Sequence, residues 1–214
     1  MKMQLSALLM AALLTSSPEL AAAPNASATQ TPASTPPGKP PSTPASAAAG
    51  ARLGVCEAAM ARASAKHGVP LAILYAVGMT ETGGNGTLQP LAMNAGGKSL
   101  VATSPADGAR KLAEFKARGV NLVDLGCMQI NHRWHGDQFA SVAEMFDPER
   151  NVDYAARFLA ELRQRHGNWT MAAARYNAGP DNDPAQKRYV CAVIRNLVRS
   201  GFGSWTAQSR AFCA

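Results

Sequence analysis

Apolar and polar positions along most of the chain recur with the period of an α-helix, and glycine or proline marks where the predicted helices end. An alanine-rich segment over 53–67 ends at Gly68. Pro70 then precedes a second segment, 71–81, that is apolar on nearly every side. A helix with apolar residues all round is normally buried. The pattern therefore predicts a helical domain with residues 71–81 in its interior.

Capping signals predict the remaining helices. A side chain that caps the first turn, or proline at the first helical position, is typical of a helix start, and glycine is typical just beyond the end. By these signals we predict further helices over 105–118, from Ser141 with a capping box to Glu144, over 148–166, from Asn168 to about Asn177, and from Asp183-Pro184 to Arg199. Residues 98–103 form the one short strand that we predict, so the expected fold class is mainly α.

The first 50 residues differ from the rest in composition. Residues 1–23 have a lysine near the start, a short apolar stretch and small residues at the end, the pattern of a cleaved secretory signal peptide. We therefore expect a periplasmic or secreted protein. Residues 24–50 consist mainly of proline, alanine, serine and threonine and bury too little apolar surface to fold, which predicts a disordered linker. The predicted folded domain is 51–214.

Charge narrows the classes of partner. The formal net charge is +7, which favours an anionic polymer, such as a cell wall rich in carboxylates, or a membrane surface. The basic residues do not form a block with interleaved aromatic side chains, so nucleic acid is not an expected partner.

Four cysteines in an exported chain predict two disulfides. They are Cys56, Cys127, Cys191 and Cys213, and the sequence does not choose among the three possible pairings. Because Cys56 and Cys213 bracket the domain, their pairing would clamp its ends, and this is our working hypothesis. The cysteines and histidines lack the spacing of a zinc site, so no metal is expected.

Glu81 is the first candidate for chemistry. It ends the apolar helix and is followed by Gly83 and Gly84, which would leave room for a sugar chain. Burial among apolar residues raises the pKa of a carboxyl group. Such a glutamate can hold a proton near neutral pH and donate it to a glycosidic oxygen.

Two later segments offer groups that fit a sugar site. Residues 124–131 contain amide side chains, which bond hydroxyl and acetamido groups, and Met128, whose thioether can pack on a pyranose face. In 173–180, the hydroxyl of Tyr176 can bond a buried glutamate and orient it. Each segment alone also fits an ordinary loop or helix end.

Taken in order, three motifs resemble those of the soluble lytic transglycosylase (SLT) domain, which is related in fold to goose-type lysozyme. They are Glu-Thr-Gly at 81–83, Gly-Cys-Met-Gln-Ile-Asn at 126–131 and Ala-Arg-Tyr-Asn-Ala-Gly-Pro at 174–180. The resemblance covers about 55–200. It implies a lysozyme-like helical domain with a small irregular or β-containing insert. It also implies cleavage of the β-1,4 bond between N-acetylmuramic acid and N-acetylglucosamine in peptidoglycan, without a cofactor.

The resemblance also implies a role for each matched residue. Glu81 is the single acid/base, and the product is a 1,6-anhydromuramoyl end. Tyr176 is the second catalytic position and supports the glutamate. The substrate-binding positions are Thr82, Gly126, Met128, Gln129, Ile130, Asn131 and Asn177. Thr82 stands where the family usually has serine, and the interval between Glu81 and Gly126 is longer than in compact members.

Two alternatives stay open. A lysozyme-like muramidase would use water in place of the C6 hydroxyl group and, if inverting, a second carboxylate about 6.5–9.5 Å from Glu81. No motif supplies that carboxylate, and we interpret Asp124 as structural. The second alternative is a catalytically idle peptidoglycan-binding subunit, because 126–131 and 146–151 resemble the branch found beside envelope-spanning secretion, conjugation or pilus systems.

Four aromatic or imidazole side chains near these motifs have other interpretations. Trp134 fits sugar stacking and core packing equally, and Trp169 is expected in the core. His132 and His135 lie three residues apart without a third metal ligand, so we interpret them as surface or loop residues.

Overall fold

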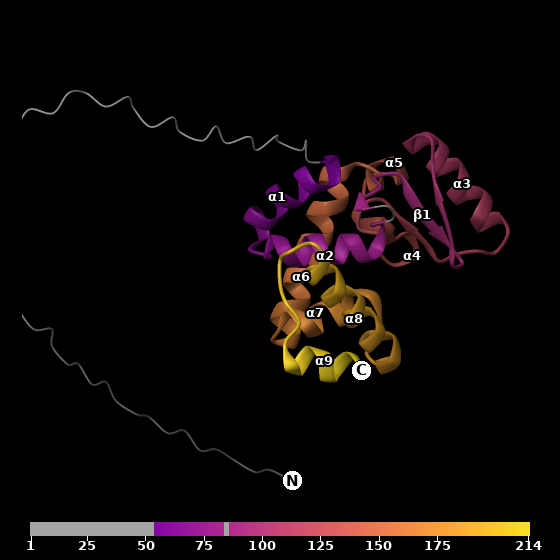
Figure 1. The fold of residues 1–214 in the computed structure, drawn as a ribbon. Coiled ribbons are helices and arrows are strands. Elements are labelled where there is room, and N and C mark those ends of the chain that lie inside the picture. Colours follow the sequence, from indigo (N-terminus) through magenta and orange to yellow (C-terminus); the bar gives the residue numbers. More distant parts are fainter. Residues whose placement is uncertain (1–53, 84–85) are drawn as a thin grey trace, which may run out of the picture. The chain divides into compact units, whose positions relative to one another are not determined.

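A computed structural model describes residues 54–83 and 86–214 (Figure 1). The predicted signal peptide and linker lie outside the described residues. The helices are α1 (Val55–His67), α2 (Leu71–Glu81), α3 (Pro105–Ala117), α4 (His132–His135), α5 (Val142–Met145), α6 (Pro148–His166), α7 (Trp169–Asn177), α8 (Asp183–Arg199) and α9 (Ala207–Cys213), with a 3-10 turn at Gly136–Gln138. The strands are β1 (Ala92–Ala95), β2 (Lys98–Val101), β3 (Val123–Leu125) and β4 (Ile130–Asn131). The expected mainly α class, with a small β-containing insert, is confirmed.

The predicted helix starts are confirmed because side chains cap them. Ser104, Asp147 and Asn168 each accept a hydrogen bond from the backbone N–H three residues further on. The capping box at Ser141 is half formed. Its hydroxyl accepts from the N–H of Glu144, but the Glu144 carboxylate accepts from the N–H of Ala140 instead of that of Ser141.

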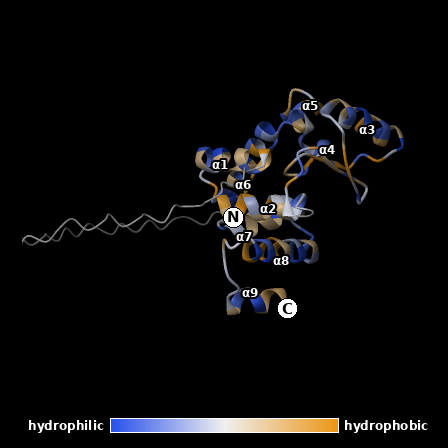
Figure 2. Cartoon of the chain, turned by 45° about the horizontal axis from the view of Figure 1, so that its top comes forward, coloured by the Kyte–Doolittle hydropathy of each residue, from blue (hydrophilic) through white to orange (hydrophobic). Residues whose placement is uncertain are grey.

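The apolar helix α2 lies in the interior, as its sequence predicts. It packs against both α1 and α8, while α6 packs against α1 and α7. Blue and orange segments alternate along α8 in Figure 2, consistent with one buried and one solvated face. Gly78 lets α2 approach the Met60 side chain of α1 closely, because a Cβ at position 78 would lie 2.4 Å from the Met60 methyl group. In the described part of the chain no helix is long and apolar enough to span a membrane.

The insert between α2 and α6 holds a four-stranded antiparallel sheet with the order β2-β1-β3-β4. Only β2 falls on the predicted strand, and it ends at Val101. Strands β3 and β4 pair Asp124 with Asn131 and Leu125 with Ile130. The second motif is therefore a β-hairpin whose turn spans 126–129, and this places its side chains on two opposite faces.

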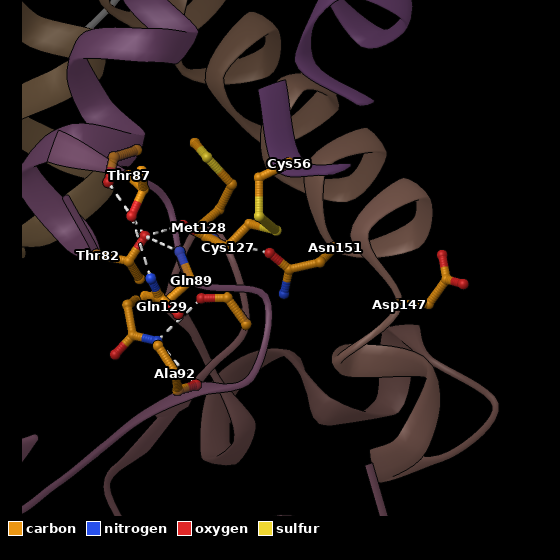
Figure 3. Close-up of a disulfide and its surroundings, with 12 residues drawn as sticks. Cys56, Thr82, Thr87, Gln89, Ala92, Cys127, Met128, Gln129, Asp147 and Asn151 are labelled. Carbon is orange, nitrogen blue, oxygen red and sulfur yellow. Dashed lines mark hydrogen bonds between the residues drawn. A yellow bond between two sulfur atoms is a disulfide. The ribbon is translucent and has the colours of Figure 1, made fainter. Parts of the chain in front are cut away.

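The disulfides correct our working hypothesis. Cys56 pairs with Cys127, and Cys191 pairs with Cys213, so the two bracketing cysteines are not joined. Cys56 lies at the buried start of α1, against the hairpin turn that carries Cys127 (Figure 3). Cys213 lies on α9, which packs on α8 beside Cys191. The first disulfide thus anchors the second motif to the helical core.

Candidate active site

Glu81 lies where two hollows meet. It is the last residue of α2, and it and Gln129 line both a hollow of about 680 Å³ and one of about 320 Å³. The larger hollow is walled by residues of β1 and β2, and the smaller by residues of the β3–β4 hairpin, α4 and α7. A chain-like substrate that crosses both hollows would pass directly over the Glu81 carboxyl group.

The surroundings of Glu81 favour its protonated form. Burial raises its pKa from 4.5 to about 8; a hydrogen bond from Tyr189 opposes this shift, and the negative charge of Asp124 adds to it. The Tyr189 hydroxyl group donates to Oε1 of Glu81 at 2.5 Å. At neutral pH the carboxyl group therefore carries a proton that it can donate.

The tyrosine that bonds the glutamate differs from the one that we expected. The Tyr176 hydroxyl group donates to the backbone carbonyl of Met128 at 2.8 Å, not to Glu81. Tyr176 still lines the smaller hollow with Glu81, and burial raises its pKa well above the usual value. Sequence reasoning missed Tyr189. Its only signal was its place on the buried face of α8, with Gln186, Val190 and Val193.

Three residues of the second motif support one wall of the site from the buried side. Gly126 has φ +80°, and a Cβ there would lie 2.6 Å from the Met145 carbonyl oxygen. Ile130 is almost fully buried, and Met128 is completely so. The expectation that Met128 packs on a sugar ring is therefore wrong. Its side chain points toward α2 instead, because Gly78 leaves space for its sulfur.

Four predicted binding residues have polar groups near Glu81. Gln129, with φ +47°, donates from Nε2 to the carbonyl groups of Ala92 and Gly126 at 3.2 and 3.0 Å (Figure 3). Asn131 and Asn177 line the smaller hollow. Thr82 lines the larger one; its buried hydroxyl donates to the Cys127 carbonyl at 3.0 Å and so holds the end of α2 against the hairpin.

Asn151, which sequence reasoning did not single out, holds the hairpin in place. This fully buried side chain on α6 donates to the carbonyl groups of Leu125 and Met145 at 3.0 and 2.8 Å. It also accepts from the Met128 N–H at 2.8 Å. Figure 3 shows it beside the Cys56–Cys127 disulfide.

We expect Asn151→Ala to lower the free energy of unfolding by about 2–4 kcal/mol, because it leaves three buried backbone groups without partners. Urea unfolding measures the change. Gln164→Ala, an exposed amide on the same helix, is the control and should stay within about 0.5 kcal/mol of the native protein. Equal stability of the two variants would contradict the anchoring role.

A family model described as "Transglycosylase SLT domain" matches residues 58–196, well over half of the chain. The chain belongs to the SLT transglycosylase family. Searches of curated proteins and of solved structures found no match. Family membership gives the protein a lytic transglycosylase-type function that acts on peptidoglycan. The matched SLT region includes all three sequence motifs and ends within the last turn of α8.

The SLT domain brings a second carboxyl group, that of Asp124, to the hollow that contains Glu81. Burial raises the pKa of Asp124, and a hydrogen bond that Asn131 Nδ2 donates to Oδ1 at 2.6 Å opposes the shift. This bond agrees with the structural role that we expected.

Trp134 of the SLT domain lies on the cleft, not in the core. Its side chain is 64% exposed and lines the smaller hollow, which excludes the core packing that was one of its two interpretations. Trp169 is partly buried and packs against the core. His135 lies with Nδ1 2.7 Å from the Tyr154 hydroxyl oxygen. Among the described residues, no three His, Cys, Asp or Glu side chains gather as a metal site.

Proposed function

We propose that this protein is a lytic transglycosylase that cleaves the β-1,4 bond between N-acetylmuramic acid and N-acetylglucosamine and leaves a 1,6-anhydromuramoyl end. The observation that carries the proposal is Glu81, a carboxyl group whose pKa burial raises to about 8, placed where two hollows meet. A glycan strand that occupies both hollows would present a glycosidic oxygen to that proton.

In the proposed reaction Glu81 acts first as acid and then as base. Its carboxyl proton passes to the glycosidic oxygen as the bond from C1 of the muramic sugar to that oxygen breaks. The acetamido oxygen of the same sugar stabilises the positive C1. The Glu81 carboxylate then accepts the proton of the C6 hydroxyl group, and O6 bonds to C1. Glu81 ends with its proton restored, and no water is consumed.

Neighbouring residues support both states of Glu81. The Tyr189 hydroxyl group donates to the carboxylate that forms after proton transfer, which stabilises that charge. Tyr176 lines the hollow and, through the Met128 carbonyl, holds the hairpin wall near Glu81. Gln129, Asn131 and Asn177 line the smaller hollow beside Glu81, and we propose that their amide groups bond sugar hydroxyl and acetamido groups, because amides both donate and accept hydrogen bonds.

Mass spectrometry of the fragments that the native protein releases from purified peptidoglycan tests the proposal. Anhydro products, which are one water lighter than hydrolysed products, are the expected result. A folded protein that binds peptidoglycan but releases nothing would instead indicate the idle subunit.

A lysozyme-like muramidase is the second candidate, and the position of Asp124 favours it. Asp124 shares the smaller hollow with Glu81, and its charge raises the Glu81 pKa. As a base it would take a proton from a water molecule that attacks C1. The same mass spectra distinguish the two candidates. Reducing-end products from the native protein that are lost in Asp124→Asn would show that the enzyme is a hydrolase and not a lytic transglycosylase.

Tyr189→Phe is expected to slow cleavage about tenfold and to move the alkaline limb of the kcat/KM profile to higher pH. The Tyr189 hydrogen bond lowers the Glu81 pKa, so its loss raises that pKa further while the ionised form loses a donor. Tyr75→Phe, a tyrosine partly buried on α2 that does not line either hollow, is the control. A slower rate with an unmoved alkaline limb would mean that Tyr189 acts only in packing.

We also propose that residues 1–23 are an export signal and that the mature protein works in the periplasm or outside the cell. Two disulfides and a peptidoglycan-directed family support a non-cytoplasmic location. Amino-terminal sequencing of the exported protein tests this, and an intact Met1 after export would refute cleavage.

A further inference from the structure

A basic hollow adjoins the candidate active site. It measures about 410 Å³ and is lined by Lys116, Asn121, His132 and Arg133. Three of these are chain neighbours of residues that line the smaller hollow beside Glu81, namely Leu122, Asn131 and Trp134. Arg133 of this hollow lies against the ring of Trp134, which lines the smaller hollow, so the basic hollow adjoins the Trp134 end of the cleft.

The positive charges of this hollow have no partner within the described part of the chain. Lys116 and Arg133 form none of the ion pairs found there, and no acidic side chain lines the hollow. Burial and the charge of Lys116 lower the pKa of His132, which disfavours its charged form. The Arg133 guanidinium lies 4.9 Å from the Trp134 ring centre, so it stays beside the cleft.

We propose that this hollow binds a carboxylate of the peptide stem that the muramic sugar in the cleft carries. The inference rests on the proposed action on peptidoglycan. An unpaired lysine and arginine around one hollow fit an anion, since charge-assisted hydrogen bonds to carboxylates are stronger than neutral ones. In stem-bearing glycan the lactyl carboxyl group of the muramic sugar is tied up in the amide bond to the stem, so the free carboxylates are those of the stem.

The geometry allows a stem to reach. A stem of four residues spans about 13 Å when extended, and the Arg133 guanidinium lies only 4.9 Å from the centre of the Trp134 ring. The exposed Trp134 ring would hold the sugar, and Lys116 and Arg133 would hold the stem. The enzyme would therefore prefer glycan that carries stems over glycan stripped of them.

Binding measurements in the Glu81→Gln background test this without turnover. The ligands are glycan oligosaccharides with stems and the same oligosaccharides after an amidase has removed the stems, which leaves a carboxylate only on the lactyl group at the muramic ring. We expect the stem-bearing ligand to bind about three- to tenfold more tightly at low salt, and the preference to shrink as salt screens the charges. Lys116→Gln should reduce this preference.

Arg118→Gln is the matched control, because Arg118 is an exposed cation two residues from Lys116 that does not line the hollow. It should keep the preference. Lys116 is a cleaner target than Arg133, whose replacement would also disturb Trp134. A selective loss in Lys116→Gln would support the proposal.

Three results would overturn the proposal. The first is equal binding of the two ligands by Glu81→Gln alone, and the second is an equal loss of the preference in Lys116→Gln and Arg118→Gln. The third is displacement of the stem-bearing ligand by inorganic phosphate as readily as by free stem tetrapeptide. None of these depends on cleavage. A native protein that releases no anhydro products would refute the proposed function while leaving the measured stem preference intact.

Discussion

Glu81→Gln is expected to lower kcat for peptidoglycan cleavage by about 10²–10⁴-fold, the contribution of a general acid–base group. Glutamine has the size of glutamate and can still accept the hydrogen bond that Tyr189 donates to Oε1. It carries no proton that it can give to a glycosidic oxygen, and it cannot take the proton of the C6 hydroxyl group. Both proposed steps should therefore fail in one variant.

Release of soluble fragments from purified peptidoglycan measures the loss. Glu114→Gln, which makes the same chemical change at an exposed site on α3, is the control and should cleave at the native rate. Sedimentation with insoluble peptidoglycan should show that Glu81→Gln still binds. A variant that is folded and retains most of the native rate would remove Glu81 from the mechanism.

Seven helices in the described part of the chain were predictable because their signals are local, whereas α4 and α9 were not predicted. A cap such as Ser104 or Asp147 and a glycine such as Gly68 lie within the helix ends that they define. The short strands were not, because β1 contains only four residues and pairs with β3, about thirty positions along the chain. No period can be recognised in so few residues.

The disulfides and the partner of Glu81 depend on packing that no local signal encodes. Cys56 bonds to Cys127 because α1 lies against the hairpin turn, and the spacing of cysteines in the sequence does not predict that contact. Likewise, both Tyr176 and Tyr189 lie near Glu81, and the packing of α8 on α2 decides that Tyr189 reaches the carboxyl group.

The second motif shows how a sequence can indicate the chemistry of a site without its orientation. Met128 and Gln129 are adjacent, and both were expected at the sugar. In the turn, Gln129 lines the two hollows while Met128 fills the space beside Gly78. The alternation of faces holds for strands and does not extend to a turn, so only the structure could separate the residue that lines the hollows from the core residue.

The last prediction concerns how Glu81 makes the free energy of unfolding of the protein depend on pH. Its pKa is about 8 in the folded protein, against 4.5 for the ordinary carboxyl group. Between these pH values the unfolded chain releases the proton and the folded chain keeps it, so stability falls as pH rises, by about 1.4 kcal/mol per pH unit. Below pH 4.5 both states are protonated, and above pH 8 both are ionised, so the difference levels off.

Glu81→Gln should therefore be more stable than the native protein, by an amount that grows from near zero at pH 4 to as much as about 4–5 kcal/mol at pH 8. Urea unfolding of both proteins at pH 4, 6 and 8 measures this, and other titrating groups cancel in the comparison. Glu114→Gln should show no such trend. If Glu81→Gln follows the native pH dependence, Glu81 is ionised in the folded protein at neutral pH. It would then lack the proton that the proposed acid step requires.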